Sequence, residues 1–172
     1  MTIEKEESNI AFIDAQNLRK TLLNHNTTLD FYKFREYLRK RFNAKRAVVF
    51  LGWAKWLRED YKYYYRAGFE IEFKDAIPYI EHGRRVMKAN VDIDMAVSVL
   101  GEHYGEYDKA IIVTGDGDFI PLVRFLRKKN LLKALIIPNI SDYSQVYNEQ
   151  GLMPYRYFLS SLETRLEILT GE

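Results

Sequence analysis

The chain has 172 residues, of which 47% are hydrophobic and 29% are charged, a composition that is typical of a globular protein and excludes a fibrous or disordered chain. Its formal net charge of +2 is too small to indicate nucleic-acid binding by itself, so any basic surface has to be local. Because the sequence contains no cysteine, a disulfide framework, a thiolate zinc site and a cysteine nucleophile are all excluded.

The sequence also gives no sign of a membrane segment or of a histidine site. The first residues, MTIEKEES, contain no apolar signal core, and no apolar run approaches the roughly 20 residues that span a bilayer. We therefore expect no membrane partner and a cytoplasmic location. The three histidines, His25, His82 and His103, lie far apart and none has a metal-ligand spacing, which disfavours a histidine-based centre.

The predicted elements begin with a strand at residues 9–14, an apolar run that ends at Asp14. A helix at 29–42 follows, with Asp30 as its N-cap and apolar side chains on one face. The next elements are a strand at 47–53, a helix at 56–68 that ends at a glycine, and a strand at 69–73.

The second half of the chain continues this alternation after an irregular segment. Residues 74–90 contain Pro78 and Gly83, and we interpret them as a functional loop with room for a short extra strand. The later predictions are helices at 91–104 and 118–130, strands at 109–115 and 132–138, and a weaker pattern over 139–172 with two short helices and a strand near 155–158.

The order of these elements predicts the fold class. Strands that are apolar along their whole length alternate with amphipathic helices, which indicates a three-layer, Rossmann-like α/β fold with a parallel sheet covered by helices on both faces. No repeat, low-complexity tract or linker divides the chain, so we predict a single domain over residues 1–172, with 139–172 as its C-terminal helical extension.

Acidic residues follow two of the predicted strands. Asp14 ends the first strand, and Asp116 and Asp118 follow the fourth in the stretch VTGDGDF. Ligands of an open parallel sheet bind beyond the carboxyl ends of its strands, so these three acids converge if the two strands are neighbours. Local explanations exist for each acid, since GDGD is a common turn, Asp118 can cap the following helix and Asp14 can cap a loop.

The helix at 91–104 offers a fourth acid. At about 100° per residue, Asp92 lies within about 40° of Ala96 and Val99, and so should face the sheet with them. Asp94, about 200° from Asp92, should face outward together with Ser98. An irregular first turn could exchange the two acids, so Asp94 is the doubtful member of the site.

Carboxylates that crowd together repel one another, and a divalent cation relieves this repulsion. Hard oxygen ligands suit Mg²⁺ or Mn²⁺, and we predict that Asp14, Asp92, Asp116 and Asp118 hold such an ion. A bound ion of this kind can activate water and stabilise the charge of an in-line phosphoryl transfer, by a one-metal or a two-metal scheme.

Three blocks of the sequence resemble the signature motifs of NYN domains, in the LabA-like branch of the PIN-like nuclease superfamily. They are FIDAQNL at 12–18, KANVDIDMAV at 88–97 and VTGDGDFIPLV at 113–123, and they occur in the family's order within residues 9–138. The resemblance implies a Rossmann-like sheet, an acidic metal-binding cleft and metal-dependent ribonuclease activity. Its functional positions correspond to Asp14, Asn17, Asp92, Asp116 and Asp118.

Two positions depart from the family pattern. Ala15 stands where the family usually has glycine, so the backbone there must avoid a positive φ or accept strain. Ser98 stands where many members have a further aspartate, which weakens a metal-binding role for this position.

We therefore predict a ribonuclease that uses Mg²⁺ or Mn²⁺ to hydrolyse phosphodiester bonds of single-stranded or structured RNA. The predicted substrate-binding residues are Asn17, Arg84, Arg85, Lys88 and Thr114, although a solvated basic loop, a turn-forming asparagine and a turn-capping threonine would account for them equally. The sequence does not decide between RNA and DNA as the substrate. It also does not decide the oligomeric state, for which a homodimer is one option.

Two other functions fit the same acids. One is a non-catalytic regulatory or RNA-binding module that retains the acidic pocket. The other is a metal-dependent phosphatase, which ranks lower because Gln16 stands where aspartyl-phosphate enzymes have a second aspartate, two residues after the first.

Overall fold

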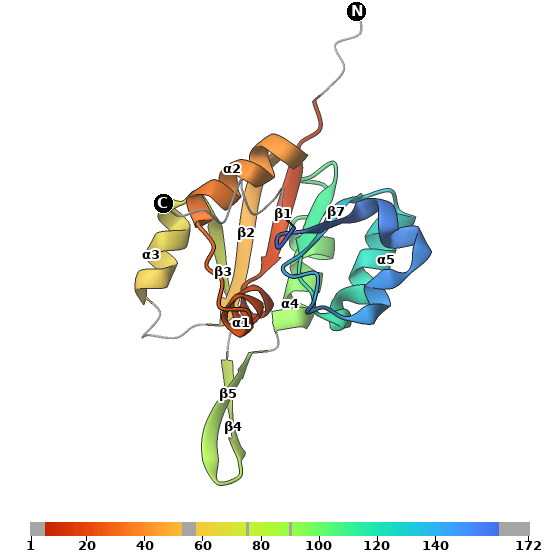
Figure 1. Ribbon diagram of the computed structural model, residues 1–172. Helices are drawn as coiled ribbons and strands as arrows, with labels where there is room; N and C mark the ends of the chain where they lie inside the picture. Colours follow the sequence, from red (N-terminus) through yellow and green to blue (C-terminus); the bar gives the residue numbers. More distant parts are fainter. Residues whose placement is uncertain (1–5, 53–57, 75, 90, 162–172) are drawn as a thin grey trace, which may run out of the picture.

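The computed structural model describes residues 6–52, 58–74, 76–89 and 91–161 (Figure 1). Within this part of the chain, a parallel six-stranded sheet has the strand order β3-β2-β1-β6-β7-β8. Its strands are β1 Asn9–Asp14, β2 Ala44–Gly52, β3 Glu70–Lys74, β6 Ala110–Val113, β7 Leu132–Ile137 and β8 Arg156–Phe158. Some predicted positions lie outside the described residues. They are the end of the strand predicted at 47–53, the first two residues of the helix predicted at 56–68, the N-terminal residues 1–5, and residues 162–172 of the predicted C-terminal extension.

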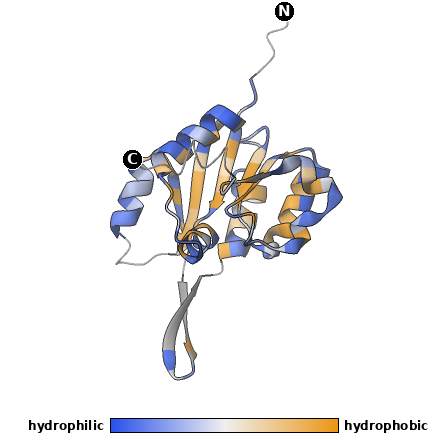
Figure 2. Ribbon diagram, viewed as in Figure 1, coloured by the Kyte–Doolittle hydropathy of each residue, from blue (hydrophilic) through white to orange (hydrophobic). Residues whose placement is uncertain are grey.

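Helices cover both faces of this sheet, which confirms the predicted three-layer α/β fold. One face packs against α1 Ala15–Asn24, α2 Phe31–Phe42 and α3 Arg58–Arg66, and the other packs against α4 Val91–Val97, a π-helix Ser98–Glu102, α5 Ile120–Lys128 and the 3₁₀-helices Gln145–Asn148 and Gln150–Tyr155. Alternate residues of the central strands enter opposite core clusters, so β1, β2, β6 and β7 are apolar along most of their length, as Figure 2 shows.

The strand order places β1 at the centre of the sheet. From β1 the chain moves outward through β2 and β3, and it then returns to pair β6 with the other side of β1. The order therefore reverses between β1 and β6, and the register of Ile13 with Val113 brings the ends of these two strands to the same level. A ligand site is expected beside this reversal.

Within the segment 74–90 that we predicted as an irregular loop, residues 76–89 form a β-hairpin, and residues 75 and 90 lie outside the described part of the chain. Strands β4 Ala76–Glu81 and β5 Arg84–Ala89 pair in antiparallel fashion around a two-residue turn, in which His82 and Gly83 have left-handed φ values of 50° and 74°. Both strands are edges, so Pro78 is tolerated although it cannot donate to the ladder. The hairpin projects beyond the carboxyl edge of the main sheet (Figure 1).

Two further expectations need correction. Helix α1 was not predicted, because Asp14, which ends β1, also caps this helix through a hydrogen bond from the Asn17 amide. Ser98 was predicted to face outward, yet it is 1% exposed. The prediction centred the buried face of the helix on Asp92, whereas the residues that pack on the sheet include Val91, and Ser98 lies within about 20° of Val91.

The C-terminal part of the described chain agrees with its prediction. Two short 3₁₀-helices precede strand β8, which joins the sheet beside β7. Across the described ranges, no helix combines the length and the apolar character that crossing a membrane requires.

Candidate metal centre

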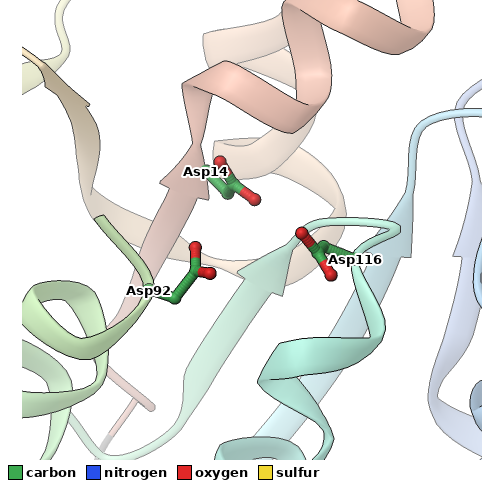
Figure 3. Close-up of side chains that lie close together, drawn as sticks. All are labelled: Asp14, Asp92 and Asp116. Atoms are coloured by element: carbon green, nitrogen blue, oxygen red, sulfur yellow. The ribbon is translucent and has the colours of Figure 1, made fainter. Parts of the chain in front are cut away.

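Three of the four predicted acids meet at the carboxyl edge of the sheet. Asp14 ends β1, Asp92 lies in the first turn of α4, and Asp116 follows β6 (Figure 3). One carboxylate oxygen from each residue lies within 4.8 Å of the corresponding oxygens of the other two. The convergence that the strand ends predicted is therefore present in the structure.

Asp14 is the buried member of this group, with an exposed fraction of 3%. Its Oδ1 accepts a hydrogen bond from the Asn17 amide at 3.1 Å, and its Oδ2 accepts one from the Thr114 hydroxyl at 2.9 Å. Burial raises the pKa of Asp14 to about 6 against the opposing effect of these two bonds, and the nearby Asp92 and Asp116 raise it further. An ionised Asp14 is thus held in place by two neutral donors.

Asn17 and Thr114 connect the two strand ends that carry the acids. The Thr114 hydroxyl, which is fully buried, accepts from the Asp116 amide at 3.1 Å, and the Asn17 side-chain oxygen accepts from the Gly115 amide at 2.8 Å. Both side chains therefore fix the turn after β6 against the start of α1. Their predicted contact with a substrate stays a prediction.

The stretch GDGD forms a turn and also contributes to the site. Asp116 caps the 3₁₀-helix Gly117–Phe119, and its Oδ1 accepts from the Asp118 amide at 3.0 Å. Asp118 itself is exposed and does not belong to the group of three carboxylates found in the described part of the chain. Its predicted role as a metal ligand stays a prediction.

Helix α4 carries two acids, Asp92 and Asp94, which differ in whether they lie near the other carboxylates. Asp92 joins the carboxylate group, whereas Asp94, about 200° further round the helix, does not. Both side chains are half-buried, on opposite flanks of the face that packs on the sheet.

Ala15, where the family pattern has glycine, begins α1 and is not among the described residues with a positive φ, so no backbone strain arises there.

The donor set of the centre fits a divalent cation. It consists of three carboxylates and includes neither nitrogen nor sulfur, which favours a hard ion such as Mg²⁺ or Mn²⁺. The raised pKa of Asp14 reflects burial together with repulsion from Asp92 and Asp116. A cation bound among the three residues would remove this repulsion and favour the ionised form of Asp14.

The basic residues predicted to bind substrate lie on the hairpin. Arg84, Arg85 and Lys88 belong to β5, which ends at Ala89, three positions before Asp92 in the sequence. At about 3.3 Å per residue, Arg84 lies about 16 Å along the strand from Ala89. The base of the hairpin is thus next to the acids in the chain, while exposed Arg84 lies at its far end.

Sequence reasoning missed one residue of the site, Tyr147. Its side chain is fully buried, and its hydroxyl donates a hydrogen bond to the main-chain carbonyl of Asp116. Burial raises the pKa of Tyr147, and Asp116, Asp14, Asp118 and Asp92 raise it further. The residue lies in the weakly patterned region after 138, and no motif marks a contact that spans 31 positions.

Comparison with known proteins identifies the family. Among solved structures, the chain is similar to a protein of unknown function from Vibrio parahaemolyticus, with 21% identity over 92% of this chain and 94% of that chain and a TM-score of 0.67. It also matches the T5 D15 protein co-crystallised with metal ions, with 14% identity over 83% of this chain and 60% of that chain and a TM-score of 0.42. Comparison with curated proteins found no match. The family model of the NYN domain matches residues 9–146, which include all four predicted acids, and the chain therefore belongs to the NYN domain family.

Proposed function

We propose that this NYN domain is a metal-dependent ribonuclease of the LabA-like branch, which hydrolyses phosphodiester bonds of RNA with Mg²⁺ or Mn²⁺. The observation that carries the proposal is the group formed by Asp14, Asp92 and Asp116, whose oxygens lie within 4.8 Å of one another beside the reversal of strand order. When bound, the cation supplies a site that activates water and neutralises charge on the phosphate.

The protein's own contribution to this chemistry is to hold the Asp14 carboxylate and the main chain of Asp116 in fixed positions. The Asp14 carboxylate accepts hydrogen bonds from the Asn17 amide and the Thr114 hydroxyl. The Thr114 hydroxyl oxygen in turn accepts a hydrogen bond from the Asp116 amide. The two oxygens of Asp14 are therefore preorganised before any ion or substrate binds, which reduces the reorganisation that accompanies catalysis. Asp118 is exposed on the same turn.

Cleavage of RNA tests this function directly. Labelled single-stranded RNA, structured RNA and single-stranded DNA are incubated with the wild type in Mn²⁺, Mg²⁺ or EDTA. We expect metal-dependent RNA cleavage that falls more than about 100-fold in Asp92→Asn and Asp116→Asn, because the loss of a direct ligand exceeds the 10- to 100-fold effect of removing an outer partner.

Asp94→Asn is the matched control, because it makes the same change on the same helix outside the carboxylate group. It should retain most of the wild-type rate. Equal cleavage by the wild type, Asp92→Asn and Asp116→Asn would exclude the proposed centre as the source of the activity.

The hairpin supplies a second prediction. Substituting Arg84, Arg85 and Lys88 together by alanine should weaken RNA binding and flatten its salt dependence, because each lost phosphate contact lowers the slope of log K against log salt by about 0.7 for a single strand. Three contacts would change the slope by about 2 units. Fluorescence anisotropy of labelled RNA with catalytically inactive Asp116→Asn protein, at several salt concentrations, measures this slope.

The control for the hairpin variant removes the same amount of charge elsewhere. Arg39, Lys40 and Arg41 lie in the last turn of α2, which leads into the start of β2 and so lies at the opposite edge of the sheet from the acids. Their alanine variant should keep the wild-type slope. If the two triple variants lower the slope equally, the hairpin has no special part in RNA binding.

A regulatory module without catalysis is the second candidate, and one observation favours it. Ser98, at the position where many NYN domains have a further aspartate, is buried, and its hydroxyl donates to Glu72 at 2.9 Å. This candidate predicts that the wild type binds Mn²⁺ or RNA but shows no turnover with any of the three substrates. The cleavage assay therefore separates the two functions.

A further inference from the structure

The segment from Ser144 to Tyr147 packs directly against the GDGD turn. The Ser144 amide donates to the Gly115 carbonyl at 2.9 Å, and the Tyr147 hydroxyl donates to the Asp116 carbonyl. A Cβ atom placed on Gly117 would collide with the Ser144 side chain, so glycine is required for this close approach. The turn that carries Asp116 thus packs closely against a second segment of the chain.

Two buried hydroxyl groups hold the main chain of Asp116, one at its amide and one at its carbonyl. Its amide donates to the Thr114 hydroxyl at 3.1 Å, and its carbonyl accepts from Tyr147. Thr114 and Tyr147 are both 0% exposed, so water does not compete for these bonds. With both peptide groups fixed, the direction of the Cα–Cβ bond of Asp116 is fixed as well.

We propose that Tyr147 is a positioning residue, which sets the direction of the Asp116 carboxylate toward the metal by holding the Asp116 carbonyl. The inference rests on the proposed function of this site. Tyr147 lies one position beyond the residues matched by the family model, 9–146, so the match itself assigns it no role.

Tyr147→Phe tests this role, because it keeps the aromatic ring and removes only the hydroxyl. Tyr107→Phe is the matched control. Tyr107 is 6% exposed, belongs to the same core cluster, and its hydroxyl likewise donates to a main-chain carbonyl, that of Val99, at 2.9 Å. Both variants lose one buried hydrogen bond to a carbonyl, but only one of these carbonyls belongs to a carboxylate residue of the centre.

Three quantities distinguish positioning from general stabilisation. Mn²⁺ alone is titrated into each folded protein and its affinity is measured by calorimetry, with the spectrum of bound Mn²⁺ recorded by electron paramagnetic resonance. Urea unfolding without metal gives the stability of each variant, and RNA cleavage gives kcat and KM. We expect similar losses of stability, but a Mn²⁺ affinity that falls about tenfold or more only in Tyr147→Phe. In that variant kcat should fall while KM for RNA stays unchanged.

Two results would overturn the inference. Wild-type Mn²⁺ affinity in Tyr147→Phe would show that the hydroxyl does not position Asp116, and an equal fall in Tyr107→Phe would show that the effect is a general loss of stability. A wild-type protein that binds no Mn²⁺ would instead overturn the metal centre together with this inference, so the two failures are distinguishable.

Discussion

Asp14→Asn is expected to give a protein that is at least as stable as the wild type at pH 7 without metal, yet binds no Mn²⁺ and does not cleave RNA. Asp14 is 3% exposed, and burial, together with Asp92 and Asp116, raises its pKa to about 6. At pH 7 the wild type therefore holds an unfavourable charge, and the neutral amide removes it.

Asparagine can also contact the same two partners, although the direction of one hydrogen bond reverses. Its oxygen can accept from the Asn17 amide, and its NH₂ group can donate to the Thr114 hydroxyl oxygen, which already accepts from the Asp116 amide. The substitution therefore removes a metal ligand but leaves the hydrogen of the buried Thr114 hydroxyl without its acceptor. This loss costs about 1–3 kcal/mol, which does not exceed the cost of about 3 kcal/mol for holding Asp14 charged at pH 7. Urea unfolding at pH 7 in EDTA and calorimetric titration of Mn²⁺ measure the two effects separately.

Asp30→Asn is the control for this substitution. Asp30 caps α2 as Asp14 caps α1, and its side chain accepts from the amides of Tyr32 and Lys33. The same change at this helix should leave Mn²⁺ affinity intact. If Asp14→Asn binds Mn²⁺ as tightly as the wild type, Asp14 is not a ligand.

The second large effect is the dependence of stability on pH. Between pH 3.8 and about 6 the folded protein binds the Asp14 proton more tightly than the unfolded chain does, so the free energy of unfolding should fall as the pH rises through this range. A shift from 3.8 to about 6 corresponds to a contribution of about 3 kcal/mol, present below pH 4 and lost by about pH 7. Mn²⁺ binding at pH 7 adds a separate stabilisation, of about 2.7 kcal/mol at 100 times Kd.

Other carboxylates oppose this trend, so the comparison must isolate Asp14. Glu70, for example, accepts hydrogen bonds from Arg46 that lower its pKa, and its contribution is present at neutral pH and lost on acidification. The difference in unfolding free energy between the wild type and Asp14→Asn, measured in EDTA from pH 4 to pH 7, cancels such shared contributions. A difference that stays constant over this range would contradict the raised pKa of Asp14.

The sequence predicted those parts of the fold and site that depend on periodicity and strand ends. Strands β1, β2, β6 and β7 are apolar along most of their length because both faces of the sheet are covered, and this pattern is visible without a structure. Asp14, Asp92 and Asp116 could be grouped because strand ends and the first turn of a helix meet at one edge of a parallel sheet.

Other features depend on information that local patterns do not contain. The direction of the Asp118 side chain depends on the backbone torsions of a glycine-rich turn, and the burial of Ser98 depends on which face of α4 packs on the sheet. The contact of Tyr147 with Asp116 arises only when the chain after β7 folds back over the turn. Such contacts are set by tertiary packing and have no local signature.

A crystal structure after soaking with Mn²⁺ tests the central claim most directly, because Mn²⁺ can be located by its anomalous scattering. We predict a peak among Asp14, Asp92 and Asp116, with oxygen ligands at about the 2.1 Å that is typical of a small divalent cation. The same map shows whether Asp118 binds this ion or a second one. Three separated carboxylates, or no peak among them at a saturating Mn²⁺ concentration, would contradict the metal centre on which the proposed ribonuclease activity depends.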